Sequence, residues 1–241
     1  MKKKFSEIRY AMKMSTIEGS LSTIFQFLTI GDNGSGPFII GLALFLGTND
    51  LQIGILGSLP FALQFFQVVS AIIIQRIGSR RVFVAITSLL ARSVFFVLAI
   101  LPFIPFLSTE KKILILFFVL IFYNINGVMS GNAWTSWVSD LFHEKIRGTY
   151  FGFRNGIFSI IRIIAIFGAG LLLDHFIKLN KSNLGYSVIM AIGATAGTVG
   201  AIFFFKHPDR VLNVNENINI IKLTLTPLKN KYYLKILFFF F

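Results

Sequence analysis

The stretch LQIGILGSLPFALQFFQVVSAIIIQRIGSRRVFVAITSLLARSVFFVLAILPFIPFL, residues 51–107, contains two long apolar runs joined by a short basic loop. Each run has the roughly 20 residues that a helix needs to cross the hydrocarbon core of a bilayer. The loop between them, at residues 75–81, carries three arginines, which mark a polar turn outside the membrane. This stretch therefore predicts a helical hairpin that crosses a membrane twice.

The same alternation of apolar runs and polar loops continues on both sides of this hairpin. The segments long enough to span a bilayer are residues 21–46, 51–74, 82–107, 113–138, 150–177 and 186–205. We therefore predict an all-α polytopic membrane protein with six transmembrane helices in a bundle over residues 19–205. Residues 1–18 are expected to form a basic tail and residues 206–231 a polar loop. Residues 232–241, YYLKILFFFF, are expected to be the truncated start of a seventh helix.

Composition supports this class. The chain is 55% hydrophobic and only 14% charged, whereas a soluble domain is about 25% charged. Soluble enzymes and disordered chains are thereby excluded. Cysteine is absent, which excludes a disulfide framework and a thiolate metal site. No phosphate-binding glycine loop of the P-loop type occurs, so we expect neither ATP-driven pumping nor any cofactor.

The basic residues are distributed unevenly between the two sides of the predicted membrane. The net charge of +13 comes mostly from the tail and from alternate loops, which hold 17 of the 23 Lys and Arg, against four on the opposite side. Basic loops stay in the cytoplasm. We therefore expect both ends of the chain in the cytoplasm and the protein in the inner (plasma) membrane. This distribution favours membrane orientation over nucleic-acid binding as the reason for the charge.

Three features resemble the N-terminal half of a major facilitator superfamily (MFS) transporter. The first is the loop AIIIQRIGSRR at residues 71–81, although Ala71 and Gln75 replace the glycine and aspartate of the family's signature. The second is SDLFHEKIRGTYFGFRNG at residues 139–156, where the basic and glycine positions match. The third is the polar IGDNGSGPF inside the first predicted span, at residues 30–38.

The resemblance implies a fold and a function. The family has twelve helices in two six-helix halves, each half a pair of inverted three-helix repeats. It implies secondary active transport of a small solute by alternating access, with the lipid bilayer, the solute and, where transport is coupled to them, protons as partners. The protein partner would be a missing C-terminal half or a second copy of this chain. The family also implies a gating role for its cytoplasmic loop residues, here Arg76, Gly78, Arg80, Arg81, Arg147 and Gly148. For the three arginines of the first loop, the alternative is that they only set the orientation of the helices in the membrane.

Two charged residues lie inside predicted spans and are candidates for the transport chemistry. Asp32 lies in the first span among helix-breaking glycines, and a buried carboxylate there costs at least about 2.5–3.5 kcal/mol. Asp32 is either the group that couples transport to protons or other ions, or a structural carboxylate. In the second case it pairs with an internal arginine or caps a kink in the helix. Arg162 lies about 18 Å into the fifth span. It either binds an anionic or hydroxyl-bearing solute or forms a structural salt bridge, for which Asp32 is a candidate partner.

Uncharged polar residues on the second and fourth spans are weaker candidates for solute contact. Each is expected either to contact the solute or to form hydrogen bonds between helices: Gln64, Gln67, Asn132 and Trp134. For Trp134 a further alternative is a place in the aromatic belt at the membrane interface. Gly127 and Gly131 form a G-x-x-x-G pair, which is typical of close helix packing. Arg92 lies inside the third span, and we expect it to have a packing role or to form an ion pair.

Other functions were weighed against transport. The sequence IGD at residues 30–32 partly matches intramembrane aspartyl proteases, but a second mid-membrane aspartate is missing, and two carboxylates are needed. We therefore predict that the protein is not an enzyme. A non-transporting scaffold or regulator, and a half-transporter that dimerises, remain as alternatives. Alone, the chain is expected to be a truncated permease that does not transport.

Overall fold

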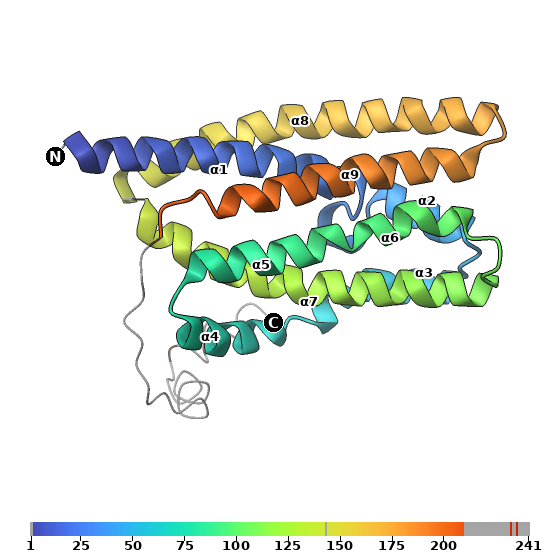
Figure 1. Cartoon of the computed structure of the whole chain (residues 1–241), viewed down its shortest axis with the longest axis horizontal. Coiled ribbons are helices and arrows are strands. Elements are labelled where there is room, and N and C mark those ends of the chain that lie inside the picture. Colours follow the sequence, from blue (N-terminus) through green and yellow to red (C-terminus); the bar gives the residue numbers. More distant parts are fainter. Residues whose placement is uncertain (1, 143, 210–231, 233–234, 236–241) are drawn as a thin grey trace.

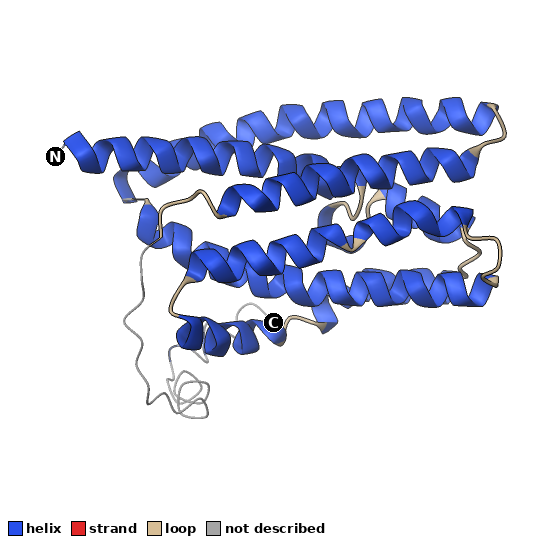
Figure 2. Ribbon diagram, in the orientation of Figure 1, coloured by secondary structure: helices blue, strands red, loops and turns tan. Residues whose placement is uncertain are grey.

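The computed structural model describes residues 2–142, 144–209, 232 and 235, and all regular structure in these residues is helical (Figure 2). The elements are α1 (Lys2–Leu28), η1 (Asp32–Gly34), α2 (Pro37–Phe45), α3 (Asp50–Ala62), α4 (Phe66–Ile77), α5 (Arg80–Ser93), α6 (Phe95–Ile100), η2 (Leu101–Phe103), α7 (Thr109–Leu141), α8 (Glu144–Lys178) and α9 (Ser182–Phe204). The expected loop at 206–231 and the expected seventh helix at 232–241 fall almost entirely outside the described residues. The boundary expected at residue 18 falls inside α1.

The long helices run side by side (Figure 1). α9 lies at the centre, because it packs against both α1 and α5. α8 continues the row beyond α1, and α7 followed by α4 continues it beyond α5. The turns α4–α5 and α7–α8 lie at the same end as the start of α1, and the α8–α9 turn lies at the opposite end (Figure 1). The basic loops therefore gather at one end of the bundle.

Within the residues that the structure describes, four helical stretches are long and apolar enough to cross a membrane by themselves: Arg80–Phe103, Thr109–Leu141, Ile146–Lys178 and Ser182–Phe204. The pair α3 and α4 makes a fifth if its 42° bend lies within one span. At this bend the backbone amides of Gln64 and Phe66 bond to the carbonyls three residues earlier instead of four. The second predicted span is therefore broken rather than straight.

The first predicted span, residues 21–46, is also not one helix. α1 ends at Leu28 and α2 begins at Pro37, with a compact loop between them. Gly31 and Gly36 touch through their backbones, since a Cβ on Gly31 would lie 2.2 Å from the Gly36 Cα. Gly31 also has a φ of 69°, which other residues rarely adopt. Glycine at both positions explains why the chain turns here instead of continuing as a helix.

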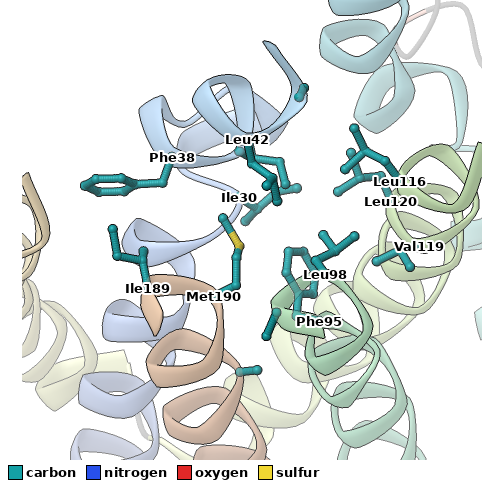
Figure 3. Close-up of a cluster of buried hydrophobic side chains, with 14 of the residues drawn as sticks. Ile30, Phe38, Leu42, Phe95, Leu98, Leu116, Val119, Leu120, Ile189 and Met190 are labelled. Carbon is teal, nitrogen blue, oxygen red and sulfur yellow. The ribbon is translucent and has the colours of Figure 1, made fainter. Parts of the chain in front are cut away.

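The core lies where α1, α2, α6, α7 and α9 meet (Figure 3). Met190 and Leu42 are fully buried there, beside the aromatic ring of Phe95. α1 and α9 approach closely because α9 presents glycines to α1. A Cβ on Gly197 would lie 2.6 Å from Phe25, and one on Gly193 would lie 2.6 Å from Thr29. In contrast, most of α8 is not packed against other helices, since only 6% of its most apolar stretch is buried.

Candidate functional site

A cavity of about 340 Å³ lies among α1, α5, α7, α8 and the end of α9. Its walls combine charged, hydroxyl, amide and aromatic side chains with small residues. The lining residues are Glu18, Gly19, Ser22, Thr23, Gln26, Ser88, Ala91, Arg92, Tyr123, Gly127, Ser130, Gly131, Trp134, Arg154, Phe158 and Phe204. Such a concave site with a few convergent polar groups is the usual form of a small-molecule site.

Glu18 is the buried carboxylate of this cavity, with a side chain that is 3% exposed. Its Oε1 accepts hydrogen bonds from Arg92 Nη2, at 3.0 Å, and from the hydroxyl of Ser22. Its Oε2 lies 3.9 Å from Arg154 Nη2. One carboxylate from α1 thus lies between arginines from α5 and α8, and the three form the Glu18 cluster.

Arg154 lies among aromatic rings. Its guanidinium carbon is 4.4 Å from the ring centre of Phe158 and 5.3 Å from that of Trp134. Its Nε donates a hydrogen bond of 3.4 Å to the carbonyl of Ser15. Gly19 makes room for this arrangement, since a Cβ there would lie 2.2 Å from Phe158 and 2.4 Å from Arg154. Cation–π contacts of this kind stabilise a cation that is removed from water.

A second ion pair lies nearby along α1 and α8. Arg162 Nη2 is 3.1 Å from Asp32 Oδ2, and both side chains are about half exposed. Gln26, which lines the cavity, donates from Nε2 to Asp32 Oδ1 at 3.2 Å. The Arg162 guanidinium also lies 4.3 Å from the ring centre of Phe27. Of the alternatives considered from sequence, the pairing of Asp32 with Arg162 is present in the structure.

The remaining predicted site residues divide between two places. Trp134 lines the cavity and lies over Arg154. Gln64, Gln67 and Asn132 lie instead at the contact of α4 with α7. There Asn132 Nδ2 donates to the Gln67 carbonyl at 3.2 Å and to Ser70 Oγ at 2.8 Å, and Gln67 bonds to the side chain of Gln64. These three amides bond between and along helices, as membrane amides usually do.

Comparison with known proteins identifies the family of this chain. The family profile described as Major Facilitator Superfamily matches residues 21–241. The chain belongs to the major facilitator superfamily. No curated protein and no solved structure matches it. The resemblance seen in the loop and span motifs is therefore confirmed, and the protein is a multi-pass membrane protein of a family that transports small solutes.

The loop at residues 75–81 of this MFS chain has Gln75 in place of the family's aspartate, yet its arginines still form ion pairs with other segments. Arg80, at the start of α5, forms a salt bridge with Asp140 near the end of α7. Arg81 lies 3.6 Å from Asp209, and Ser79 Oγ donates to the same Asp209 carboxylate at 2.6 Å. Asp140 thus supplies the charge pairing between α5 and α7, and Asp209 ties α5 to the segment that follows α9. These contacts form the basic-end cluster.

The other loop residues have simpler surroundings. Gly78 caps α4 in the left-handed region, with a φ of 70°. Arg147 Nη2 donates to the carbonyls of Ser139, at 2.7 Å, and Phe142, at 3.1 Å, and so secures the α7–α8 turn. Arg76 and Gly148 are exposed.

Two predictions about packing are revised. Gly127 and Gly131 do not make a close helix contact: a Cβ on Gly131 would meet no atom within 4 Å, and both residues line the cavity instead. Glu18, which belongs to the expected tail, lies instead at the centre of the cavity. The signal for it was Arg92, because a mid-span arginine requires a carboxylate partner, and the chain has only ten acidic residues.

Proposed function

We propose that this MFS chain forms the N-terminal six-helix half of a secondary active transporter that moves a small solute by alternating access. The six spans would be the four long helices, the bent pair α3–α4, and α1 with α2 as a broken span, arranged as two inverted three-helix repeats. The observation that carries the proposal is the Glu18 cluster in its cavity. A scaffold would have no need of such costly groups at membrane depth.

The depth of the Glu18 cluster supports transport. Arg92 lies twelve residues after Arg80, which corresponds to about 18 Å along the helix and places it near the bilayer midplane. Charges at that depth are costly, and in membrane proteins they mark solute or ion pathways. The Glu18 cluster shares its cavity with hydroxyl groups, including the pair Ser88 and Ser130, whose Oγ atoms are 2.5 Å apart.

We assign the second ion pair to coupling. Uptake of a proton by Asp32 would break its salt bridge with Arg162, and the freed guanidinium would then contact the solute. Gln26 links this pair to the cavity, so a change at Asp32 would be felt there. Trp134 would contact the solute directly. Gln64, Gln67 and Asn132 would hold α4 against α7 during the motion and border the path.

We assign the basic-end cluster to gating. Arg80 and Asp140 hold α5 and α7 together at the end where the N-terminus lies, and Arg81 holds the chain that follows α9. Three more residues would take part in gating at this end of the bundle: Arg76, Arg147 and Gly148. This end would face the cytoplasm, by the positive-inside rule, with the protein in the plasma membrane. An opposing six-helix half, or a second copy, would supply the other wall of the path.

Single cysteines can test topology and alternating access, because the chain contains no cysteine. Ser79→Cys and Leu179→Cys mark the two ends of the bundle, and Gly131→Cys marks the cavity without a clash. We expect an impermeant maleimide to label Ser79→Cys only from the cytoplasmic side and Leu179→Cys only from outside. Gly131→Cys should react from both sides, in right-side-out and inside-out vesicles.

The control is Ala85→Cys, at a fully buried position of α5, which should stay unlabelled. Labelling of Gly131→Cys from one side alone would contradict alternating access and favour the scaffold. If Ser79→Cys were labelled only from outside and Leu179→Cys only from the cytoplasmic side, the proposed orientation would be wrong, but the proposal of transport would stand.

A further inference from the structure

The charges that line the cavity do not balance. Glu18 contributes one negative charge, whereas Arg92 and Arg154 contribute two positive charges. The three side chains are 3%, 13% and 8% exposed, respectively, so water screens them poorly. His207, which lies close enough to interact with Glu18 and Arg154, does not add to the positive charge, because burial lowers the pKa of its imidazole. The cavity therefore has an excess of one positive charge.

The two arginines also retain unused donors. A guanidinium has five N–H donors. Among the described residues, Arg154 donates one hydrogen bond, to Ser15, and its nearest approach to Glu18, at 3.9 Å, is beyond hydrogen-bond reach. Arg92 donates to the Gly197 carbonyl, at 3.2 Å, and to Glu18. Both guanidinium groups line the cavity, so their remaining donors are available to a ligand there.

The other walls of the cavity are suited to an organic rather than an inorganic ligand. Trp134, Phe158 and Tyr123 present aromatic surface. A volume of about 340 Å³ is much larger than a simple inorganic ion requires, and it is within the range of small-molecule sites. A ligand with one anionic end and an apolar body would contact both kinds of wall.

We propose that the solute is a small organic anion, whose carboxylate binds Arg92 and Arg154 and whose apolar body lies against Trp134 and Phe158. This assignment rests on the proposed transport function. An anion would neutralise the excess charge and fill the unused donors, in hydrogen bonds that are stronger than neutral ones because both partners are charged. The Asp32–Arg162 pair is already balanced, one charge against one, and so does not attract an anion in the same way.

Three molecules of nearly equal shape test the sign of the charge: benzoate, benzamide and benzamidine, which carry charges of −1, 0 and +1. Binding to the purified chain in lipid nanodiscs would be followed by saturation-transfer NMR, with no ion gradient. We expect benzoate to bind at least tenfold more tightly than benzamide, because a charge-assisted hydrogen bond replaces a neutral one, and benzamidine not to bind. Equal binding of benzamide, tighter binding of benzamidine, or no binding of benzoate would each overturn the proposal.

Variants then locate the site. Arg154→Gln should reduce benzoate affinity at least tenfold, and Arg154→Lys, which keeps the charge, should retain part of it. Lys111→Gln removes the same charge from an exposed position at the start of α7 and should leave benzoate affinity unchanged. A loss in Lys111→Gln equal to that in Arg154→Gln would show a nonspecific charge effect and overturn the site. None of these results depends on transport, so a failure here leaves the two-sided labelling of Gly131→Cys as a separate test.

Discussion

Arg92 Nη2 lies 3.0 Å from Glu18 Oε1, although the two residues are 74 positions apart in the chain. This contact joins α1 to α5 across the central helix α9. Gly200 leaves room for it, because a Cβ there would lie as close as 3.2 Å to Arg92 Nη1 and 3.1 Å to Leu21. Replacing one partner leaves a buried charge without its counter-charge, which is strongly destabilising.

Glu18→Ala should destabilise the protein strongly. The substitution leaves both Arg92 and Arg154 without a carboxylate in a poorly hydrated site, at a cost of about 3–5 kcal/mol. Thermal unfolding in detergent, followed by circular dichroism, measures the change. Glu7→Ala removes an exposed carboxylate from the same helix and should shift the midpoint little. Equal midpoints for the two variants would show that the Glu18 cluster does not stabilise the fold.

Two glycine-to-alanine substitutions should have opposite effects. Gly197→Ala places a methyl group 2.6 Å from Phe25 and forces α1 and α9 apart, at a cost of about 1–3 kcal/mol. Gly131→Ala meets no neighbour within 4 Å and should stabilise α7 by about 0.5–1 kcal/mol through lower backbone entropy. The unfolding midpoints of the two variants, measured in parallel, decide this. A stabilised Gly197→Ala would show that α1 and α9 pack less closely than the structure indicates.

The apolar runs predict the long helices well, because a continuous stretch of about 20 apolar residues has few alternatives to a membrane helix. The runs over residues 113–138 and 150–177 lie within two of the four long apolar helices, and the runs over residues 82–107 and 186–205 overlap the other two. They do not predict where a span breaks. The close contact of Gly31 with Gly36 and the bend after Pro60 depend on local backbone geometry, to which hydropathy is insensitive.

The candidate site could be predicted only in part, and for a related reason. Asp32 and Arg162 stand out because each interrupts an apolar run, and the structure brings them together. Glu18 precedes its run among other charged residues, so it has the same local pattern as a solvated tail. Its burial depends on α5 and α8 packing around it, and that is a tertiary contact which no local pattern contains.

Acidification should weaken the packing of His207. This residue follows α9 and lies 5.3 Å from the ring centre of Trp137. Burial lowers the pKa of the His207 imidazole below its usual 6.5, with Arg154 acting in the same direction and with Glu18 and the Met14 backbone opposing. Below about pH 6.5 the unfolded chain therefore binds a proton more readily than the folded one, and stability falls as the pH decreases. Well above that pH the imidazole is neutral in both states and contributes no pH dependence.

Unfolding midpoints measured between pH 5.5 and 7.5 test this effect. His207→Phe keeps an aromatic ring beside Trp137 and should lose part of the acid-induced decrease. His175→Gln, at an exposed position of α8, should retain the full decrease. A decrease of the same size in the wild type and in His207→Phe would assign the pH dependence to other groups.

Asp32→Asn should separate coupling from solute movement. The amide cannot ionise, yet it keeps the shape of the carboxylate and can still accept the hydrogen bond from Gln26. In a full-length transporter that contains this chain, we therefore expect the variant to lose accumulation driven by a proton gradient but to keep exchange of labelled for unlabelled solute. Asp50→Asn, at an exposed position in the first turn of α3, should leave both activities intact. If accumulation survives in Asp32→Asn, the proton is carried elsewhere, and Glu18 becomes the next carboxylate to test. If exchange is lost as well, the pair with Arg162 holds the break between α1 and α2 in place rather than coupling the ion to the solute.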